Sequence, residues 1–248
     1  MKLCLIIPAY NEARRIGPTL EHYLEYLDVQ CKSGKIKDYK ILVILNGCTD
    51  NTADVISIIQ PRYEQLIMHE IVDAGKGRAI KAGFELALTY DVTHIGFVDA
   101  DMSTLPQHFF DLIDNIQHDG IIASRYAPGA QVYPARPWIK RWGSRMFYEP
   151  LVRALCKISY WDYQCGAKLF TRTTIEKITP LLTELMWAFD VEILFVCKLL
   201  GLQVVEQPTV WYDRTDSKLK LMRSGLRMLS SVVRMRITHM NVKNNKEI

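Results

Sequence analysis

Short apolar runs alternate with amphipathic stretches in the first half of this chain, and this alternation limits the folds that it can adopt. The runs have the composition of buried strands, and the stretches between them have the apolar spacing of helices. The expected strands are "KLCLIIP", "YKILVILNG", "LIMHEIV", "THIGFVDAD" and "GIIASRY". The expected helices cover residues 14–27, 51–60, 76–89 and 105–117, and Ser103 and Thr104 are the expected N-terminal caps of the last one. This order predicts an α/β fold with a Rossmann-like, mostly parallel sheet and helices on both faces.

The pattern changes after Tyr126. A Pro- and Gly-rich loop, "APGAQVYPARP", precedes an aromatic, basic stretch that predicts a helix broken at Pro150. The elements expected after it are a strand in "DYQCGAKLFTR", a buried helix in "MWAFDVEILFVCKLLG" and extended segments in "LQVVEQPTVWYD". Because no repeat or low-complexity linker divides the chain, we expect one domain over residues 1–215, followed by a C-terminal segment, 216–248.

The C-terminal segment predicts a basic amphipathic helix over about residues 218–240. Its apolar residues recur every three or four positions, at Leu219, Met222, Leu226, Leu229, Val233, Ile237 and Met240. Its basic flank consists of Lys220, Arg223, Arg227 and Arg234. Such a helix suits the surface of an anionic membrane. The alternative is that the apolar stripe packs on the domain while the basic flank faces water, and the sequence leaves both open.

Composition excludes several classes of protein. A net charge of +4 in 248 residues gives no argument for nucleic-acid binding, and no apolar run approaches the roughly 20 residues of a membrane-spanning helix. Pro8 ends the first apolar run too early for a signal peptide. The six cysteines form no CxxC pair and no zinc-ligand spacing, which favours a reducing compartment. We therefore expect a cytoplasmic protein, and if it meets a membrane we expect it to do so from the side.

Polar loops follow three of the expected strands. In open α/β sheets, ligands bind outside the carboxyl ends of the strands, so these loops form a candidate binding rim. The loops are "PAYNEARR", "NGCTDNT" and "DADMST". They place six polar residues on the rim: Asn11, Glu12, Asn46, Asp50, Asp99 and Asp101.

Asp99 and Asp101 are separated by a single residue, so their carboxylates could share one divalent cation. Hard oxygen ligands suit Mg²⁺ or Mn²⁺, which also bind the phosphate oxygens of a substrate. The alternative from spacing alone is that Asp101 caps the following helix and Asp99 is solvated.

Three other positions pose the same choice between local structure and chemistry. In "GKGRAIKAGF", backbone N–H groups, Lys76 and Arg78 could hold a phosphate, or the stretch could be a glycine turn with a solvated basic face. Asp190 begins an apolar helix and is either its N-cap or a partly desolvated general base. Asp162 and Lys168 are either turn residues or part of a site.

Taken in order, these motifs resemble those of the family-2 glycosyltransferases with a GT-A fold. The matching stretches are "IIPAYNEARRI", "ILNGCTDNT", "AGKGRAIKAGF" and "FVDADMST". The second half, through "ASRY", "DYQCGAKLFTR", "WAFDVEILF", "SKLKL" and the Arg- and aromatic-rich insert, resembles the dolichyl-phosphate glucosyltransferase branch and its prokaryotic polyprenyl-phosphate relatives. The resemblance covers about residues 3–225, and the joint order of the motifs is highly specific.

The resemblance implies an inverting, Mg²⁺- or Mn²⁺-dependent transfer of a sugar from a nucleotide-sugar to an acceptor. It assigns Asp101 and Asp99 to the metal, and Asp190, with Asp162 as second choice, to catalysis. The donor-binding residues that it implies are Pro8, Tyr10, Glu12, Asn46, Asp50, Lys76, Gly77 and Asp99. The acceptor-binding residues that it implies are Arg125, Arg141, Arg145, Gln164 and Lys168.

The branch implies glucose from UDP-glucose as the donor and a polyprenyl or dolichyl phosphate as the acceptor. A phosphate acceptor is already anionic, so it needs cations more than it needs a base. The second loop reads "LNGC", Leu45–Cys48, where the family often has a pair of acids, which leaves uracil and guanine both open. The alternatives are the same catalyst with a soluble or glycan acceptor, a nucleotidyltransferase, and a non-catalytic module that binds nucleotide-sugars at a membrane surface.

Overall fold

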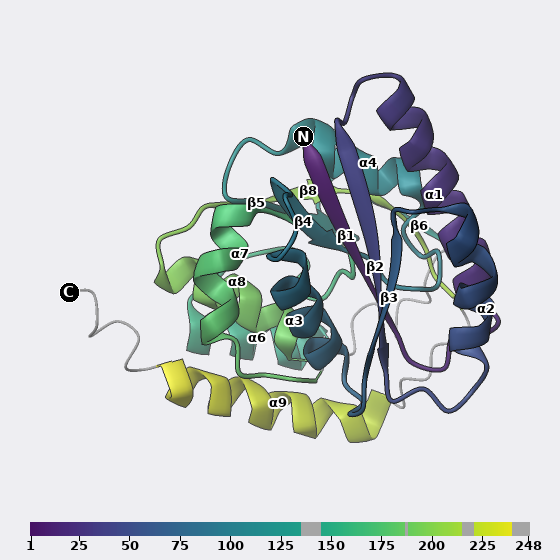
Figure 1. Ribbon diagram of the computed structural model, residues 1–248. Helices are drawn as coiled ribbons and strands as arrows, with labels where there is room; N and C mark the ends of the chain where they lie inside the picture. The colour runs from purple at the N-terminus through teal and green to yellow at the C-terminus, as the bar shows by residue number, and fades with distance from the viewer. Residues whose placement is uncertain (135–144, 187, 215–220, 240–248) are drawn as a thin grey trace.

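The computed structural model describes residues 1–134, 145–186, 188–214 and 221–239, without the side chains of 145–148 and 221–229 (Figure 1). The strands are β1 (Lys2–Ala9), β2 (Asp38–Asn46), β3 (Leu66–Ile71), β4 (His94–Phe97), β5 (Gly120–Ser124), β6 (Gln131–Tyr133), β7 (Lys168–Thr171), β8 (Val204–Pro208) and β9 (Val210–Tyr212). The α-helices are α1 (Ile16–Lys32), α2 (Thr52–Ile59), α3 (Lys76–Ala87), α4 (Pro106–Asn115), α6 (Arg145–Cys156), α7 (Arg172–Ile178), α8 (Phe189–Leu199) and α9 (Leu221–Thr238).

A seven-stranded sheet in the order β3-β2-β1-β4-β7-β5-β8 forms the centre of the molecule (Figure 1). Strand β7 runs antiparallel to both of its neighbours, and the other pairs in this sheet are parallel. A second, two-stranded sheet pairs β6 with β9. The predicted α/β fold with a mostly parallel sheet is therefore confirmed, and all five predicted strands of the first half are present.

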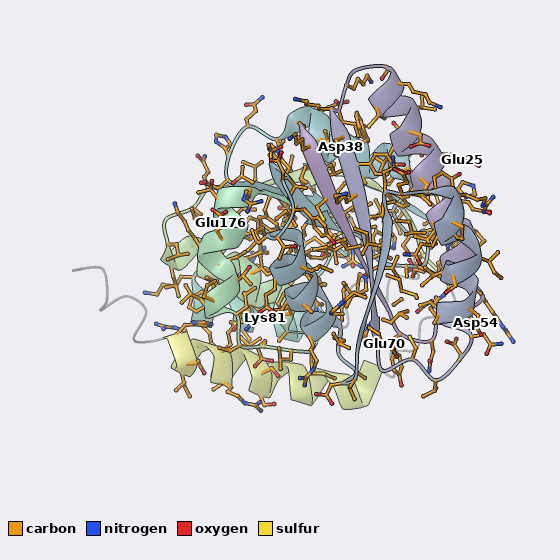
Figure 2. All side chains as sticks on the ribbon, in the orientation of Figure 1. Glu25, Asp38, Asp54, Glu70, Lys81 and Glu176 are labelled. Carbon is orange, nitrogen blue, oxygen red and sulfur yellow. The ribbon has the colours of Figure 1, made fainter. Side chains whose placement is uncertain are left out.

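The residues of β1 alternate between two hydrophobic cores because successive side chains of a strand point to opposite faces. Leu3 and Leu5 pack in one core with residues of α1, α2 and α4. Cys4 and Ile6 pack in the other with residues of α3, α6, α7, α8 and α9. The sheet is thus covered on both faces, while charged side chains such as Glu25, Asp54 and Glu176 stand outside the helices, as Figure 2 shows.

Two local predictions are wrong. Helix α6 continues through Pro150 instead of breaking there. Proline removes one backbone donor, and a helix can kink and still continue across that position. Helix α4 begins at Pro106 without a cap from Ser103 or Thr104, because its N-cap residue is Leu105.

Helix α9 packs on the domain through one face of its C-terminal half. Val232 and Met235 are fully buried in the same core as α6 and α8. The ring of His239, directly after the helix, lies 2.8 Å from the buried carboxylate of Glu192 on α8. The predicted apolar stripe does not form this contact, since two of its members, Val233 and Ile237, are exposed on the other side of the helix. Within the described ranges, no helix has the length and hydrophobicity required to cross a bilayer.

Candidate active site

The acidic pair lies directly after β4, at the carboxyl edge where the loops after β1 and β2 also lie. The chain turns at Met102, whose φ is 59°, and Asp101 Oδ1 accepts a hydrogen bond of 3.0 Å from the backbone N–H of Ser103. Arg15 Nη1 lies 4.0 Å from the other oxygen of Asp101. Both acidic side chains are partly exposed, so Asp101 forms a turn at the rim and does not cap α4.

Lys76, the first residue of α3, lies between two carboxylates. Its Nζ is 2.8 Å from Asp99 Oδ1 and 3.6 Å from Asp190 Oδ2. Glycine on either side allows this approach: a Cβ at Gly75 would meet the carbonyl of Leu185 at 2.6 Å, and one at Gly77 would meet the Cβ of Phe189 at 2.7 Å. The glycines of "GKG" therefore let the start of α3 approach α8 closely, which brings the lysine to both acids.

Asp190 is held from a second side by Lys168. The Nζ of Lys168 donates to Asp190 Oδ1 at 2.9 Å, and also to the carbonyls of Cys165 at 2.6 Å and Tyr163 at 3.3 Å. Lys168 is fully buried in β7, so these three acceptors take the place of water around its charge. Asp99, Lys76, Asp190 and Lys168 thus form a chain of alternating charge.

The two acids in this chain differ in pKa. Burial alone would raise the pKa of Asp190, but the ammonium groups of Lys168 and Lys76 outweigh it and lower the pKa below its ordinary value. At Asp99, burial raises the pKa, Lys76 opposes it, and repulsion from Asp101 adds to the rise. Asp190 is therefore a firmly ionised carboxylate with little tendency to accept a proton.

Asp162 forms a bidentate ion pair with Arg125. Its oxygens accept hydrogen bonds from Arg125 Nε at 2.7 Å and Nη2 at 2.9 Å, and a further bond from the backbone N–H of Arg125. The backbone N–H of Gln164 donates to the same carboxylate. Burial would raise the pKa of Asp162, but Arg125 outweighs it and lowers the pKa. This pair ties the segment after β5 to the loop that leads into β7.

The loops after β1 and β2 are joined by side chains of the predicted donor site. Asn46 donates to the carbonyl of Ala9 at 2.9 Å and accepts from the N–H of Gly75 at 3.1 Å, which occupies its amide with backbone groups. Asp50 accepts from the N–H of Ala13 and from both the N–H and hydroxyl of Thr52. Both residues therefore shape the rim by linking neighbouring loops.

The first loop exposes an aromatic ring beside an ion pair. Tyr10 is exposed directly after β1, and Pro8 is partly buried within the strand. Glu12 accepts two hydrogen bonds of 2.6 Å from the guanidinium of Arg15. Because the same guanidinium lies near Asp101, it connects the first loop with the acidic pair.

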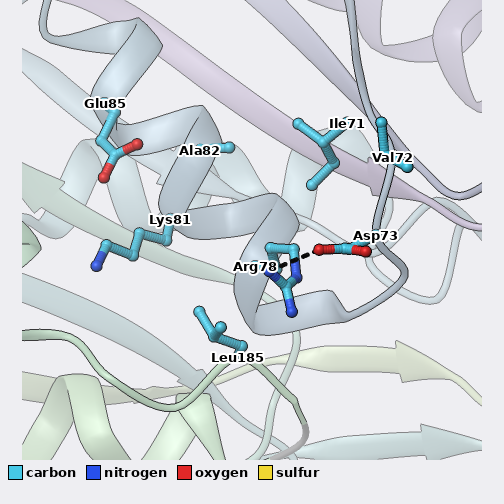
Figure 3. Close-up of a pocket in the computed structure, with 8 residues that line it drawn as sticks. All are labelled: Ile71, Val72, Asp73, Arg78, Lys81, Ala82, Glu85 and Leu185. Carbon is cyan, nitrogen blue, oxygen red and sulfur yellow. Dashed lines mark ion pairs between the residues drawn. The ribbon is translucent and has the colours of Figure 1, made fainter.

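A pocket of about 290 Å³ lies on the outer side of α3 (Figure 3). It is lined by Ile71, Val72, Asp73, Arg78, Lys81, Ala82, Glu85 and Leu185. Arg78 pairs with Asp73 across it at 3.1 Å. Of the candidate residues only Arg78 lines this pocket, and no member of the chain of alternating charge does.

Comparisons with known proteins agree with this geometry. The model of glycosyl transferase family 2 matches residues 4–179. This chain belongs to glycosyl transferase family 2.

Two curated relatives of this family 2 glycosyltransferase are both named dolichyl-phosphate beta-glucosyltransferase. It is 30% identical over 252 residues to a dolichyl-phosphate beta-glucosyltransferase of Dictyostelium discoideum, covering 96% of this chain and 75% of that protein. It is also 30% identical over 258 residues to the dolichyl-phosphate beta-glucosyltransferase of Saccharomyces cerevisiae, with the same coverage of both chains. The predicted membership and glycosyltransferase activity are thus confirmed.

Solved structures confirm the GT-A fold of this family 2 enzyme. Glucosyl-3-phosphoglycerate synthase of Mycobacterium tuberculosis superposes with a TM-score of 0.68 at 14% identity, covering 96% of this chain and 80% of that one. A complex of that synthase with Mn²⁺, UDP-glucose and phosphoglyceric acid gives a TM-score of 0.68 at 15% identity. At this level of identity the likeness establishes the fold alone.

The acidic pair of the glycosyltransferase fits a hard divalent cation that is shared with a diphosphate. Asp99 and Asp101 offer carboxylate oxygens from one turn, which Mg²⁺ and Mn²⁺ prefer. In the described part of the chain, no group of three or more His, Cys, Asp or Glu side chains is placed to hold a metal. A cation bound by this pair would therefore take its remaining ligands from water and phosphate oxygens.

The structure brings together Asp99, Asp101, Lys76, Asp190 and Lys168, and it places Asp162 and Arg125 in a pair of their own. The predictions for Arg141 and for the side chain of Arg145 fall outside the described residues. The side chain of Gln164 is partly buried, and only its backbone is recorded in a bond to the site.

Three residues of the site were not predicted. Arg15 carries a weak signal, since it lies three positions after Glu12, a spacing that brings side chains together on a helical turn. Arg214 donates to the carbonyls of Asp101 and Met102, which nothing in its local sequence indicates. Gly166 lies against the carboxylate of Asp99, and a close approach of this kind is visible only in three dimensions.

We expect Gly166→Ala to displace Asp99 and to lower the turnover of this glycosyltransferase roughly 100-fold, the cost of a misplacement of about 1 Å in an active site. A Cβ at residue 166 would overlap both carboxylate oxygens of Asp99. Steady-state kinetics gives the effect, with Gly17→Ala on α1 as a control because its Cβ has 3.3 Å to the nearest side chain. A Gly166→Ala enzyme with wild-type turnover would show that the position of Asp99 is unimportant.

Proposed function

We propose that this protein is an inverting, metal-dependent glycosyltransferase that moves glucose from UDP-glucose to a polyprenyl phosphate. The observation that carries the choice of acceptor is the pairing of Asp190. Each oxygen of its carboxylate faces the ammonium group of a buried or nearly buried lysine. An acceptor hydroxyl needs a base to remove its proton, whereas a phosphate monoester is already ionised near neutral pH. A carboxylate with a lowered pKa suits the second kind of acceptor better than the first.

The relatives support the same choice of substrates. Two curated relatives that align with nearly the whole of this chain are named dolichyl-phosphate beta-glucosyltransferases. The complex of the solved neighbour contains Mn²⁺, UDP-glucose and phosphoglyceric acid, which bears a phosphate group. Sugar nucleotide, divalent cation and anionic acceptor are therefore the combination that we propose for this chain.

Each residue of the site has a role in this proposal. Asp101 and Asp99 would hold the divalent cation, which when bound would supply positive charge for the leaving nucleoside diphosphate. Lys76 lies beside Asp99, where it fixes the orientation of that carboxylate and adds positive charge near the diphosphate. Asp190, oriented by Lys168 and Lys76, faces the reacting end of the site as a fixed anion.

The free cysteines and the proposed lipid acceptor indicate the cellular compartment of the enzyme. All six cysteines are free, as expected in a reducing compartment. A polyprenyl chain is confined to a bilayer by its apolar surface. We therefore propose that the enzyme acts peripherally at the cytoplasmic face of a membrane.

The test is transfer of labelled sugar into an organic phase. The purified protein is incubated with a panel of radiolabelled nucleotide-sugars, a polyprenyl phosphate and Mg²⁺ or Mn²⁺, and the lipids are extracted. We expect label in the organic phase with UDP-glucose, and none after chelation of the metal. Label that stays in water as a glycoside would indicate a soluble acceptor, and label as free sugar would indicate hydrolysis, so either result would contradict the proposed acceptor.

A further inference from the structure

Helix α9 has two different apolar faces. The inner face consists of Val232 and Met235, which are fully buried against the domain. The outer face includes Val233 and Ile237, of which 43% and 62% are exposed. These two belong to the stripe of three- and four-residue spacing that the sequence predicts, whereas the inner residues do not. The domain therefore accounts for one apolar face of the helix, while Val233 and Ile237, the two members of the predicted stripe whose side chains the structure describes, remain exposed.

The charge of the helix is of one sign. Residues 221–238 include Arg223, Arg227, Arg234 and Arg236 and no acidic residue. Arg236 faces the domain, where it donates to the carbonyl of Leu155 and lies over the ring of Phe195. Arg234 is exposed beside the outer apolar residues. An apolar strip with a basic flank matches the boundary between the acyl chains and the anionic headgroups of a bilayer.

The inner contacts hold α9 firmly beside the catalytic end of the domain. His239 contacts Glu192 at 2.8 Å, and Glu192 lies two residues after Asp190 on α8. The same carboxylate accepts hydrogen bonds from the N–H groups of Thr183 and Glu184. In Figure 1, α9 lies across the side of the molecule toward which β1 and β2 run. A partner on the outer face of α9 is therefore positioned at the edge of the sheet that carries the site.

We propose that the outer face of α9 binds an anionic lipid bilayer and holds the carboxyl edge of the sheet at its surface. This inference rests on the proposed function in one respect, because it names the surface from which a lipid-phosphate acceptor reaches the site. The helix stays docked through Val232, Met235 and His239 while Val233, Ile237 and Arg234 contact lipid. The attachment is thus made by a helix whose other face is packed on the domain.

The test is co-sedimentation of the full chain with vesicles of phosphatidylcholine, with and without phosphatidylglycerol. These vesicles contain no polyprenyl phosphate and the assay contains no donor, so the result does not depend on turnover. We expect binding to the anionic vesicles only, weakened by high salt. The double variant Val233→Ser, Ile237→Ser should bind at least roughly tenfold more weakly, because half-exposed apolar side chains lose their burial in lipid. Arg234→Gln should weaken binding roughly fivefold.

The matched control is Val29→Ser, Ile58→Ser, which removes two similarly exposed apolar side chains from α1 and α2. It should bind the vesicles as the wild type does. Sedimentation velocity without lipid identifies the competing occupant, a second copy of the chain. The proposal is overturned if the wild type ignores anionic vesicles, if the α9 double variant binds as well as the control, or if the double variant converts a dimer to a monomer. Transfer to a detergent-solubilised polyprenyl phosphate tests the proposed function separately, and the α9 double variant should retain it.

Discussion

Asp101→Ala is expected to lower metal-dependent sugar transfer by about 10²–10³-fold, the range seen when one group that stabilises developing charge is removed. Asp101 and Asp99 together supply the carboxylate oxygens that the acidic turn offers to a cation. The negative charge of Asp99 is already balanced by Lys76 at 2.8 Å, whereas the nearest cation to Asp101 in the described part of the chain is Arg15 at 4.0 Å. Loss of the Asp101 carboxylate should therefore remove most of the attraction for a divalent cation. The measurement is initial rate against Mn²⁺ or Mg²⁺ concentration.

A binding experiment separates this effect from a general loss of activity. Titration of Mn²⁺ into the enzyme with UDP should show weakened binding for Asp101→Ala and unchanged binding for Asp54→Ala, an exposed acid on α2. The thermal stability of both variants should stay close to that of the wild type, because both side chains reach solvent. Full activity of Asp101→Ala in a chelator would remove the metal from the proposal.

Asp190→Asn is expected to reduce turnover at least roughly 100-fold while the affinity for UDP changes less than about threefold. The carboxylate neutralises Lys168, which is fully buried, and contributes to the neutralisation of Lys76. Asparagine keeps the shape and one acceptor, but it leaves Lys168 without this carboxylate partner and Lys76 with Asp99 alone. We therefore also expect the free energy of unfolding to fall by about 3 kcal/mol, the lower end of the cost of breaking a buried ion pair.

The pH dependence of the wild type gives a second readout for Asp190. Its folded-state pKa is lowered, so its stabilising contribution is fully present above the ordinary pKa of about 3.9 and is lost only as the pH falls through the folded value. Turnover should therefore show no step from Asp190 between about pH 5 and pH 8. Asp114→Asn, on the exposed face of α4, is the matched control for Asp190→Asn and should keep wild-type turnover. Unchanged turnover in Asp190→Asn would show that the charge of Asp190 has no part in the transfer.

The first half of the fold could be predicted because each strand there is a continuous apolar run. Parallel strands buried on both faces carry this signal, and β1, with its two cores, shows why. The position of β7 between β4 and β5 could not be predicted. A strand of four residues carries too few side chains to specify its neighbours. Its antiparallel direction depends on the path of the long connection between β5 and β7, which the local sequence of β7 does not determine.

The rim of the site could be predicted from topology, but its ion pairs could not. The rule that ligands bind at the carboxyl ends of strands correctly gathered Asp99 and Asp101 with the loops after β1 and β2. Lys168 on β7 and Asp190 on α8 are 22 residues apart, so their ion pair produces no helical or strand periodicity that the sequence could reveal. A lysine inside the apolar stretch "GAKLF" was the available sign, since a fully buried lysine requires a partner.

The contact between Glu192 and His239 has a consequence for how the protein is made. The two residues are 47 positions apart in the sequence. During synthesis a domain emerges from its N-terminal side, so α8 leaves the ribosome well before its partner does. Until His239 follows, the buried carboxylate of Glu192 lacks one of its hydrogen-bonding groups and the core beneath α9 stays open. The contacts of Glu192 on α8 are therefore completed only after a further 47 residues have been translated.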